Sequence, residues 1–512
     1  MRFLHLTRNH GVTAADITAA AVSLAIWAYV ALRAGSLSIT IDEALTWAWH
    51  VSGEWDRIVL FRTPGLAGNN HVLYTLLAKL SVGLFGLSEL ALRLPSLLGF
   101  ACFLVGSNLV LRRVVPGWRQ VLGILALGLN PYLVDYFSVA RGYGLAQGLT
   151  ALGLSALLAA MCDRPGEVRL GKARAAVLLF ALATVANLSF LLVLAAAIAV
   201  LWAPLVLRVR LRGTSGVVPP RQWRAAWSLL LPSAPILIYL LRPLLLLRRK
   251  GFLAEGGTDG FWHDTVGSLI DGTIHGDALL GGHRWLLYGW VVAILILSLP
   301  VLWTLRQKNT HAFAAFAIIS GMTLLVAVAS ILQHWLFDVA YLQGRQGLFL
   351  LPLLILWALA LTTVPRTAPR ALVAAALAAG ALVPAALCIH GLMATNMTYV
   401  LDWKFDAGAR DTMLATKAWI GERQPTEAVR MRANWILAPS GNFYRTTLRL
   451  ESSLLPIEFE ERPGFDGVAD LYYVETGDQP AIEKFGVRPL LWSPVAATVL
   501  LERVQKPVEN PR

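Results

Sequence analysis

Residues 175–207 read AAVLLFALATVANLSFLLVLAAAIAVLWAPLVL, a run without a charged side chain. As one straight α-helix this run would extend ~50 Å, which exceeds the ~30 Å hydrocarbon core of a bilayer at ordinary tilt. Asn187 and Ser189 lie at its middle, where a polar turn can form. The pattern therefore predicts two membrane-crossing helices joined by a tip at Asn187.

The rest of the chain has the same character. Of its 512 residues, 56% are hydrophobic and 15% are charged, a balance that excludes both a soluble globular protein and a disordered chain. Further helix-compatible runs cover roughly 17–37, 94–111, 120–137, 143–161, 225–247, 285–305, 311–332, 346–363 and 371–393. We therefore expect a polytopic α-helical membrane protein with about 11 transmembrane helices.

The charge of the chain indicates its orientation. The net charge is +13, and Lys and Arg cluster in the short connectors between the apolar runs. Such connectors usually face the cytoplasm, so we predict a cytoplasmic N-terminus and no nucleic-acid partner. The sides alternate correctly only if the segment 71–87 dips into the membrane without crossing it, and whether it crosses stays open.

Polar segments collect on the opposite, periplasmic side. The first outer loop, residues 38–93, contains Trp47, Trp49 and Trp55, which suit the headgroup region and predict interfacial helices. In the tail, residues 407–422 favour a helix, and 433–438, 442–450, 470–475 and 497–502 favour strands. We therefore divide the chain into a transmembrane domain, 1–393, and a small C-terminal periplasmic α/β domain, 394–512.

An acidic pair, Asp42-Glu43, opens the first outer loop. A carboxylate held at the membrane surface can take a proton from an acceptor hydroxyl while a lipid-carried substrate stays in the bilayer. Successive helical side chains point in different directions, so the two carboxylates are not expected to share one role. The residues alone leave a second interpretation open, in which the pair caps and solubilises an interfacial helix.

Five sequence elements in a fixed order give the chain a family resemblance. They are Asp42-Glu43, NHVLY at 70–74, FGLSELALRLPS at 85–96, NP at 130–131 with ARGY at 140–143, and YLQGR at 341–345. Together they resemble the polytopic C-type glycosyltransferases that use polyprenyl-phosphate sugars, which include protein O-mannosyltransferases and the aminoarabinose transferases of lipid A. Val72 stands where the second element of the family has a proline, and this departure weakens aminoarabinose as the sugar.

The resemblance implies a hexosyl- or pentosyltransferase of the bacterial inner membrane. Such an enzyme moves a sugar from a polyprenyl-phosphate donor to a periplasmic or cell-surface lipid, glycan or protein, with inversion of configuration. Asp42 matches the catalytic acid of the family and would act as general base, with Glu43 orienting the acceptor or the base. The departing phosphate gains negative charge, which calls for cationic or hydrogen-bonding groups.

Several residues are candidates for these further roles. The candidates for binding the donor phosphate are His71, Arg93, Arg141, Arg248, Arg249, Lys250 and Arg345. The candidates for lining the substrate cavity are Tyr74, Asp135, Tyr143, Asn187 and Tyr341. Each also has a purely structural interpretation, because arginines at helix ends snorkel to headgroups and tyrosines populate interfacial belts.

The proposed chemistry requires no cofactor, although a divalent metal stays open. Five of the acidic and histidine side chains of the loop 248–284 could suggest a metal site, but they match no metal-binding spacing, so we expect a solvated loop. They are His263, Asp264, Asp271, His275 and Asp277. Two other functions stay open: a transporter or lipid flippase without covalent chemistry, and a membrane subunit whose tail binds a partner. Against the transporter, the sequence lacks two repeat halves with matching broken helices.

Overall fold

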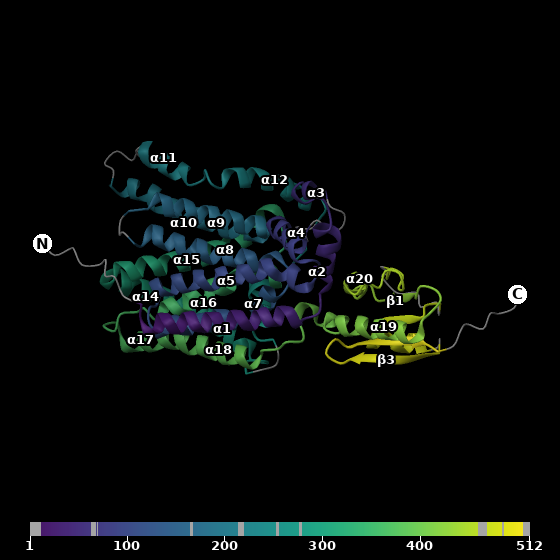
Figure 1. The fold of residues 1–512 in the computed structure, drawn as a ribbon. Coiled ribbons are helices and arrows are strands. Elements are labelled where there is room, and N and C mark those ends of the chain that lie inside the picture. Colours follow the sequence, from purple (N-terminus) through teal and green to yellow (C-terminus); the bar gives the residue numbers. More distant parts are fainter. Residues whose placement is uncertain are drawn as a thin grey trace. The chain divides into compact units, whose positions relative to one another are not determined.

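The computed structural model describes residues 12–62, 68, 70–163, 167–212, 220–251, 255–275, 279–458, 468–483 and 486–504 (Figure 1). These residues are mostly helical, with one four-stranded sheet in the tail. The chain divides into two compact units. The first unit contains Met1–Val30, Ser96–Phe137 and Gly142–Thr395, and the second contains Ala31–Pro95, Ser138–Arg141 and Asn396–Arg512.

Long apolar helices dominate the membrane part of the chain. Among the described residues, six helices are long and apolar enough to cross a membrane, or seven if a bent pair counts as one span. The six are α1 (Ala14–Ser36), α5 (Glu89–Val114), α8 (Gly142–Met161), α14 (Arg284–Lys308), α15 (Thr310–Phe337) and the run Arg370–Met393. The protein is therefore a multi-pass helical membrane protein, while the count of about 11 crossings stays a prediction.

The bent pair has a local cause. Helices α6 (Trp118–Gly128) and α7 (Pro131–Ser138) meet at 62°. Pro131 lacks an amide hydrogen and suits the first position of a helix, and the carboxamide oxygen of Asn130 accepts a hydrogen bond from the Leu133 amide at 3.1 Å. The Asn-Pro dipeptide therefore ends one helix and caps the next.

The predicted break at Asn187 is confirmed. Helix α9 (Leu170–Ala186) ends directly before it, and α10 (Leu191–Arg212) begins after the one-turn helix η3 (Leu188–Phe190). The Asn187 carboxamide oxygen accepts hydrogen bonds from the amide and the hydroxyl of Ser189, at 3.0 and 2.8 Å. Asn187 thus caps the second half of the hairpin, because its side chain replaces the missing helical partner of those groups.

Three other apolar segments form shorter helices. The run predicted at 225–247 is broken into α11 (Pro220–Ser228) and α12 (Ala234–Arg249), because Pro232 and Pro235 cannot donate helical hydrogen bonds. The run at 346–363 contains α16 (Leu350–Leu361). Helix α4 (Val72–Phe85) covers most of 71–87 and extends only ~21 Å, less than the ~30 Å hydrocarbon core. The predicted dip of this segment into the membrane stays a prediction.

The second unit contains both the first outer loop and the tail. The predicted domains instead placed the loop in residues 1–393 and the tail in residues 394–512. The loop contributes α2 (Ile41–Thr46), η1 (Trp47–Val51), α3 (Trp55–Val59) and α4. The tail contributes η8 (Leu401–Asp406), α19 (Ala409–Arg423), α20 (Ala438–Thr447) and α21 (Gln479–Glu483). Helix α19 confirms the helix predicted at 407–422.

The sheet of the tail has the order β1-β2-β4-β3. Its strands are β1 (Met431–Ala433), β2 (Leu471–Glu475), β3 (Val487–Ser493) and β4 (Thr498–Arg503), with β1 parallel to β2 and the other pairs antiparallel. The strand predicted at 442–450 is wrong, because α20 occupies most of it and buries Phe443 and Tyr444. Aromatic and Thr residues favour strands, but tertiary packing overrides that preference here.

Candidate active site

The acidic pair sits in the first turn of α2. Thr40 is the N-cap: its hydroxyl accepts a hydrogen bond from the Glu43 amide at 3.3 Å, and the Glu43 carboxylate accepts one from the Thr40 amide at 2.9 Å. This reciprocal arrangement is a capping box, which the sequence pattern Thr-x-x-Glu encodes locally. The capping interpretation therefore holds for Glu43.

Glu43 is also sealed by Arg93. Both side chains are fully buried, and the Arg93 Nε and Nη2 atoms donate to the two carboxylate oxygens at 2.8 and 2.7 Å. The Ala140 amide donates to the same carboxylate. Both carboxylate oxygens of Glu43 are therefore hydrogen-bonded to buried protein groups, an arrangement that suits the orientation of the base better than that of the acceptor.

The hydrogen-bonding capacity of Arg93 is used up. Its Nη1 donates to the carbonyls of Ala34 and Leu37 at 2.7 and 2.8 Å, and its Nη2 also donates to the Ser38 carbonyl at 2.8 Å. With the two bonds to Glu43, all five N–H groups of the guanidinium have protein acceptors. This geometry contradicts the predicted role of Arg93 in binding the donor phosphate.

Asp42 has a different environment from Glu43. Its carboxylate keeps 15% of its surface exposed and lies 3.3 Å from Nη2 of Arg141. Nη1 of Arg141 lies 3.3 Å from the hydroxyl of Thr46, and that hydroxyl donates to the Asp42 carbonyl at 2.7 Å. Arg141 thus holds both the side chain of Asp42 and the helical turn that carries it. The sequence elements predicted both Asp42 and Arg141, but not Thr46.

The remaining candidates of the second unit support the loop. The phenol of Tyr74 is fully buried and donates to the Leu92 carbonyl at 2.5 Å, so Tyr74 packs α4 against α5 and does not face a substrate cavity as predicted. His71 is buried at the N-terminal boundary of α4. A residue that the sequence analysis missed, Asp406 of η8, accepts a hydrogen bond from the Ile41 amide, next to Asp42.

In the first unit, two loops carry predicted residues. Tyr341 pairs through its backbone with Gly257 and stacks on the ring of His334 at a centroid distance of 4.1 Å. Arg345 lies half-buried in the short helix η6 (Gly344–Gly347). The Gly344 amide donates to the Ser268 hydroxyl at 2.7 Å, which ties this turn to the first residue of α13 (Ser268–Thr273).

The other first-unit candidates are scattered. Asp135 is buried 3.4 Å from the imidazole of His275, and the ring of Tyr143 packs edge-on against Tyr136 at 5.0 Å. Asn187 is the cap described above. The predicted cluster Arg248, Arg249 and Lys250 is exposed at the C-terminal end of α12.

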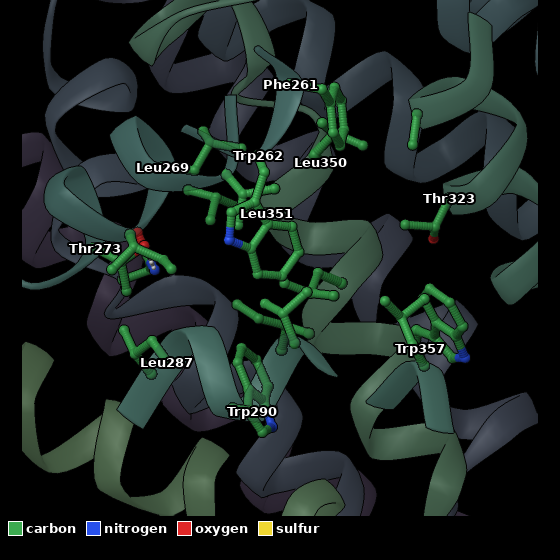
Figure 2. Close-up of a pocket in the computed structure, with 18 of the residues that line it drawn as sticks. Phe261, Trp262, Leu269, Thr273, Leu287, Trp290, Thr323, Leu350, Leu351 and Trp357 are labelled. Atoms are coloured by element: carbon green, nitrogen blue, oxygen red, sulfur yellow. Dashed lines mark hydrogen bonds between the residues drawn. The ribbon is translucent and has the colours of Figure 1, made fainter. Parts of the chain in front are cut away.

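An apolar cavity of about 250 Å³ opens in the first unit (Figure 2). Figure 2 shows the aromatic rings of Phe261, Trp262, Trp290 and Trp357 around it, and leucine is the most frequent of the remaining lining residues. The residues predicted to line a substrate cavity do not line this one. Its lining suits a hydrocarbon guest, because it offers few polar partners.

One side-chain cluster could hold a cation. Ligand atoms of Asp259, His263 and Asp264 lie within 4.8 Å of one another. The Asp264 carboxylate already accepts hydrogen bonds from the amides of Asp259 and Gly260, at 2.8 and 2.9 Å. Of the other loop residues considered for a metal, His275 lies beside Asp135, Asp271 pairs with Arg284 at 2.8 Å, and Asp277 lies outside the described residues. Metal dependence stays open.

Neither a protein-family model nor a curated protein matches the sequence. Among the solved structures with which the chain aligns, three represent different proteins. ArnT from Cupriavidus metallidurans in the apo state is 13% identical over 95% of this chain and 97% of that chain, with a TM-score of 0.49.

The other two alignments are weaker. The Archaeoglobus fulgidus oligosaccharyltransferase in complex with Zn and sulfate is 13% identical over 94% of this chain and 73% of that chain, with a TM-score of 0.40. The arabinosyltransferase EmbB from Mycobacterium smegmatis is 13% identical over 88% of this chain and 44% of that chain, with a TM-score of 0.39. All three TM-scores lie below 0.5 and describe a loose similarity of fold.

Proposed function

We propose that this protein is an integral membrane glycosyltransferase. It transfers a sugar from a polyprenyl-phosphate donor to a periplasmic or cell-surface lipid, glycan or protein. The observation that carries the proposal is the division of the acidic pair: Glu43 is sealed by Arg93, whereas Asp42 stays partly exposed beside Arg141. The order of the five sequence elements supports the same assignment.

In the proposed reaction, Asp42 is the general base. Its carboxylate takes the proton of the acceptor hydroxyl while that oxygen attacks the anomeric carbon of the sugar. The bond from the anomeric carbon to the phosphate oxygen breaks, and polyprenyl phosphate leaves. Attack opposite the leaving group inverts the configuration. One carboxylate is sufficient for this step, so Glu43 acts as a positioning residue.

Arg141 supplies positive charge next to the proposed base. The leaving phosphate gains negative charge in the transition state, and a guanidinium already oriented by Asp42 and Thr46 stabilises that charge without reorganising. His71 and Arg345 remain proposed phosphate contacts, together with the exposed cluster Arg248, Arg249 and Lys250.

The test uses the purified full-length protein in lipid nanodiscs with a labelled lipid-linked sugar pool and an envelope extract as acceptor. General acid–base catalysis contributes roughly 100-fold or more, so Asp42→Asn should lower the transfer rate by at least about 100-fold. Asp56→Asn, on the exposed face of α3 in the same loop, is the matched control and should transfer at the wild-type rate.

Two results would overturn the proposal. One is full transfer activity in a folded Asp42→Asn variant, because the reaction would then not need Asp42 as its general base. The other is flux of a lipid across proteoliposomes without any covalent sugar product, which would assign the chain to the transporters.

A further inference from the structure

The backbone that leads into Asp42 is held by the tail. In α19, the Arg410 guanidinium donates to the carbonyls of Gly35, Ser36 and Leu37 at 3.2, 3.0 and 3.1 Å. The Ile39 amide donates to the Tyr444 phenol oxygen of α20 at 2.8 Å. Hence tail residues satisfy backbone groups along most of the segment that precedes the acidic pair.

Asp406 makes the tail contact closest to Asp42. Its Oδ2 accepts a hydrogen bond from the Ile41 amide at 2.7 Å. Ile41 is the first residue of α2, and the amides of a first helical turn have no partner within the helix. The capping box satisfies the Glu43 amide, and Asp406 satisfies that of Ile41. Both ends of this first turn are thus bound, with Asp42 between them.

We propose that Asp406 is a neutral, protonated carboxyl that positions Asp42 by holding the Ile41 amide, so that one residue of the tail orients the proposed base. This inference rests on the proposed function, in which Asp42 is the base. It assigns Asp406 as a positioning residue.

The surroundings of Ser440 support the protonated form. Its hydroxyl oxygen lies 2.9 Å from the Leu437 carbonyl and 2.8 Å from Oδ1 of Asp406. A hydroxyl has one hydrogen, and a carbonyl can only accept. When Ser440 donates to Leu437, its remaining contact is satisfied by a proton on Oδ1 of Asp406. A neutral carboxyl therefore lets both contacts of Ser440 form at once, whereas an ionised one takes the hydrogen of Ser440 and leaves the Leu437 carbonyl with the Gly441 amide at 3.0 Å.

Burial and the nearby charges also favour the protonated form of Asp406. Asp406 is fully buried, and this burial raises its pKa well above the ordinary value. The hydrogen bonds from Ile41 and Ser440 lower the pKa and the nearby carboxylates of Glu43 and Asp42 raise it, but burial outweighs the two hydrogen bonds. The titratable groups that face it are Asp42 and Glu43 of α2 and Tyr473 of β2. A neutral Asp406 holds α2 without adding a further negative charge next to the proposed base.

Ionisation of Asp406 at high pH would reverse this effect. The new charge would repel Asp42 and require a hydrogen bond from Ser440 at the expense of Leu437. We therefore expect kcat to fall on the alkaline side while KM stays nearly constant, because the position of the Asp42 carboxylate is disturbed and the substrate contacts are not.

The experiment compares three variants of the full-length protein in nanodiscs. Asp406→Asn mimics the neutral carboxyl, since its oxygen can accept from Ile41 and its amide can donate to Ser440. Asp406→Ala removes both contacts. Asp411→Asn changes an exposed carboxyl at the start of α19 and is the matched control. The readouts are hydrogen–deuterium exchange of peptides covering residues 36–47 and the pH profile of kcat.

Asp406→Asn and Asp411→Asn should exchange like the wild type, and Asp406→Asn should lose the alkaline fall in kcat. Asp406→Ala should exchange about tenfold faster, the size expected for a lost helix cap. Equal damage in Asp406→Asn and Asp406→Ala, or unchanged exchange in Asp406→Ala, would overturn the inference. If Asp406→Ala does not fold, Ser440→Ala replaces it, with the same expected direction.

The exchange measurement needs no activity, so it separates this inference from the proposed function. Normal protection of residues 36–47 in an inactive wild type would refute the glycosyltransferase and leave the tail contact intact. Conversely, transfer that depends on Asp42 but tolerates every Asp406 variant would refute the positioning role alone.

Discussion

Adjacent carboxylates acquire different properties when their neighbours differ. Glu43 is paired with Arg93 in a fully buried contact, and Asp42 meets Arg141 at a site that keeps some exposure. A buried ion pair is costly to form but much costlier to break, because the remaining partner keeps an uncompensated charge. At this scale the pair is best described as one supporting residue and one candidate reactive residue.

Breaking the buried pair should therefore destabilise the second unit strongly. We expect Glu43→Gln to lower the free energy of unfolding by about 3–5 kcal/mol, the usual cost of leaving a buried charge unpaired. Thermal unfolding of the detergent-solubilised protein, monitored by Trp fluorescence, measures this loss of stability. Glu54→Gln breaks an exposed pair with Arg57 on the same loop and should leave the unfolding temperature unchanged. Equal effects of the two variants would contradict the assigned role of Glu43.

At the scale of elements, the sheet of the tail is stabilised by a buried, hydrogen-bonded carboxylate as well as by an apolar core. Its core contains Tyr472, Val474, Val499 and Leu501. Beside that core, Glu502 of β4 is buried and receives hydrogen bonds from Trp419, Arg423 and Arg488. Burial alone would raise its pKa, but these hydrogen bonds and the charges of Arg423 and Arg488 hold the pKa of Glu502 below its usual range.

A lowered carboxyl pKa makes the tail sensitive to acid. The stabilisation by Glu502 is present above the pKa of the unfolded chain, about 4.3, and is lost as the pH falls through the lower pKa of the folded state. We expect the unfolding temperature of the tail, followed by Trp419 fluorescence, to drop below about pH 4.3 in the wild type. Glu502→Gln should be less stable at pH 7 and show a weaker acid drop, and the exposed Glu483→Gln should behave like the wild type.

At the scale of the whole molecule, the chain combines a helical membrane part with a tail bound to the first outer loop. The topology with a cytoplasmic N-terminus and a periplasmic tail is a prediction from the distribution of Lys and Arg. The long apolar helices are consistent with several crossings, but their lengths alone do not orient them.

Cysteine labelling tests that orientation. Single cysteines at Ser52, Gln307 and Glu422 replace exposed residues of the first outer loop, the last turn of α14 and the tail. A membrane-impermeant maleimide applied to intact spheroplasts should label the cysteines at 52 and 422, and should label the one at 307 only after permeabilisation. Protection of position 422 together with labelling at 307 would invert the topology. The native Cys102, Cys162 and Cys388, replaced by Ala, give the unlabelled background.

The sequence alone indicated the helical membrane fold, the break at Asn187 and the helix at 407–422. Each of these depends on apolar run length or on residues a few positions apart, so it leaves a pattern that can be read along the chain. Asp42 and Arg141 became candidates in another way, through the order of five elements that resemble a family. Strand β3 and helix α20 were missed or mistaken, because packing in the tail overrides local preference.

Only the tertiary structure decided what Arg93 binds, what Tyr74 contacts and how Asp406 meets α2. The Ile41 amide and the Asp406 carboxylate are separated by 365 positions, and such a contact has no periodicity or spacing to reveal it. The same holds for Arg93, whose charge suggested a phosphate ligand until five protein acceptors accounted for its five N–H groups. A side chain's chemistry follows from its type, but its role follows from which partners the fold leaves it.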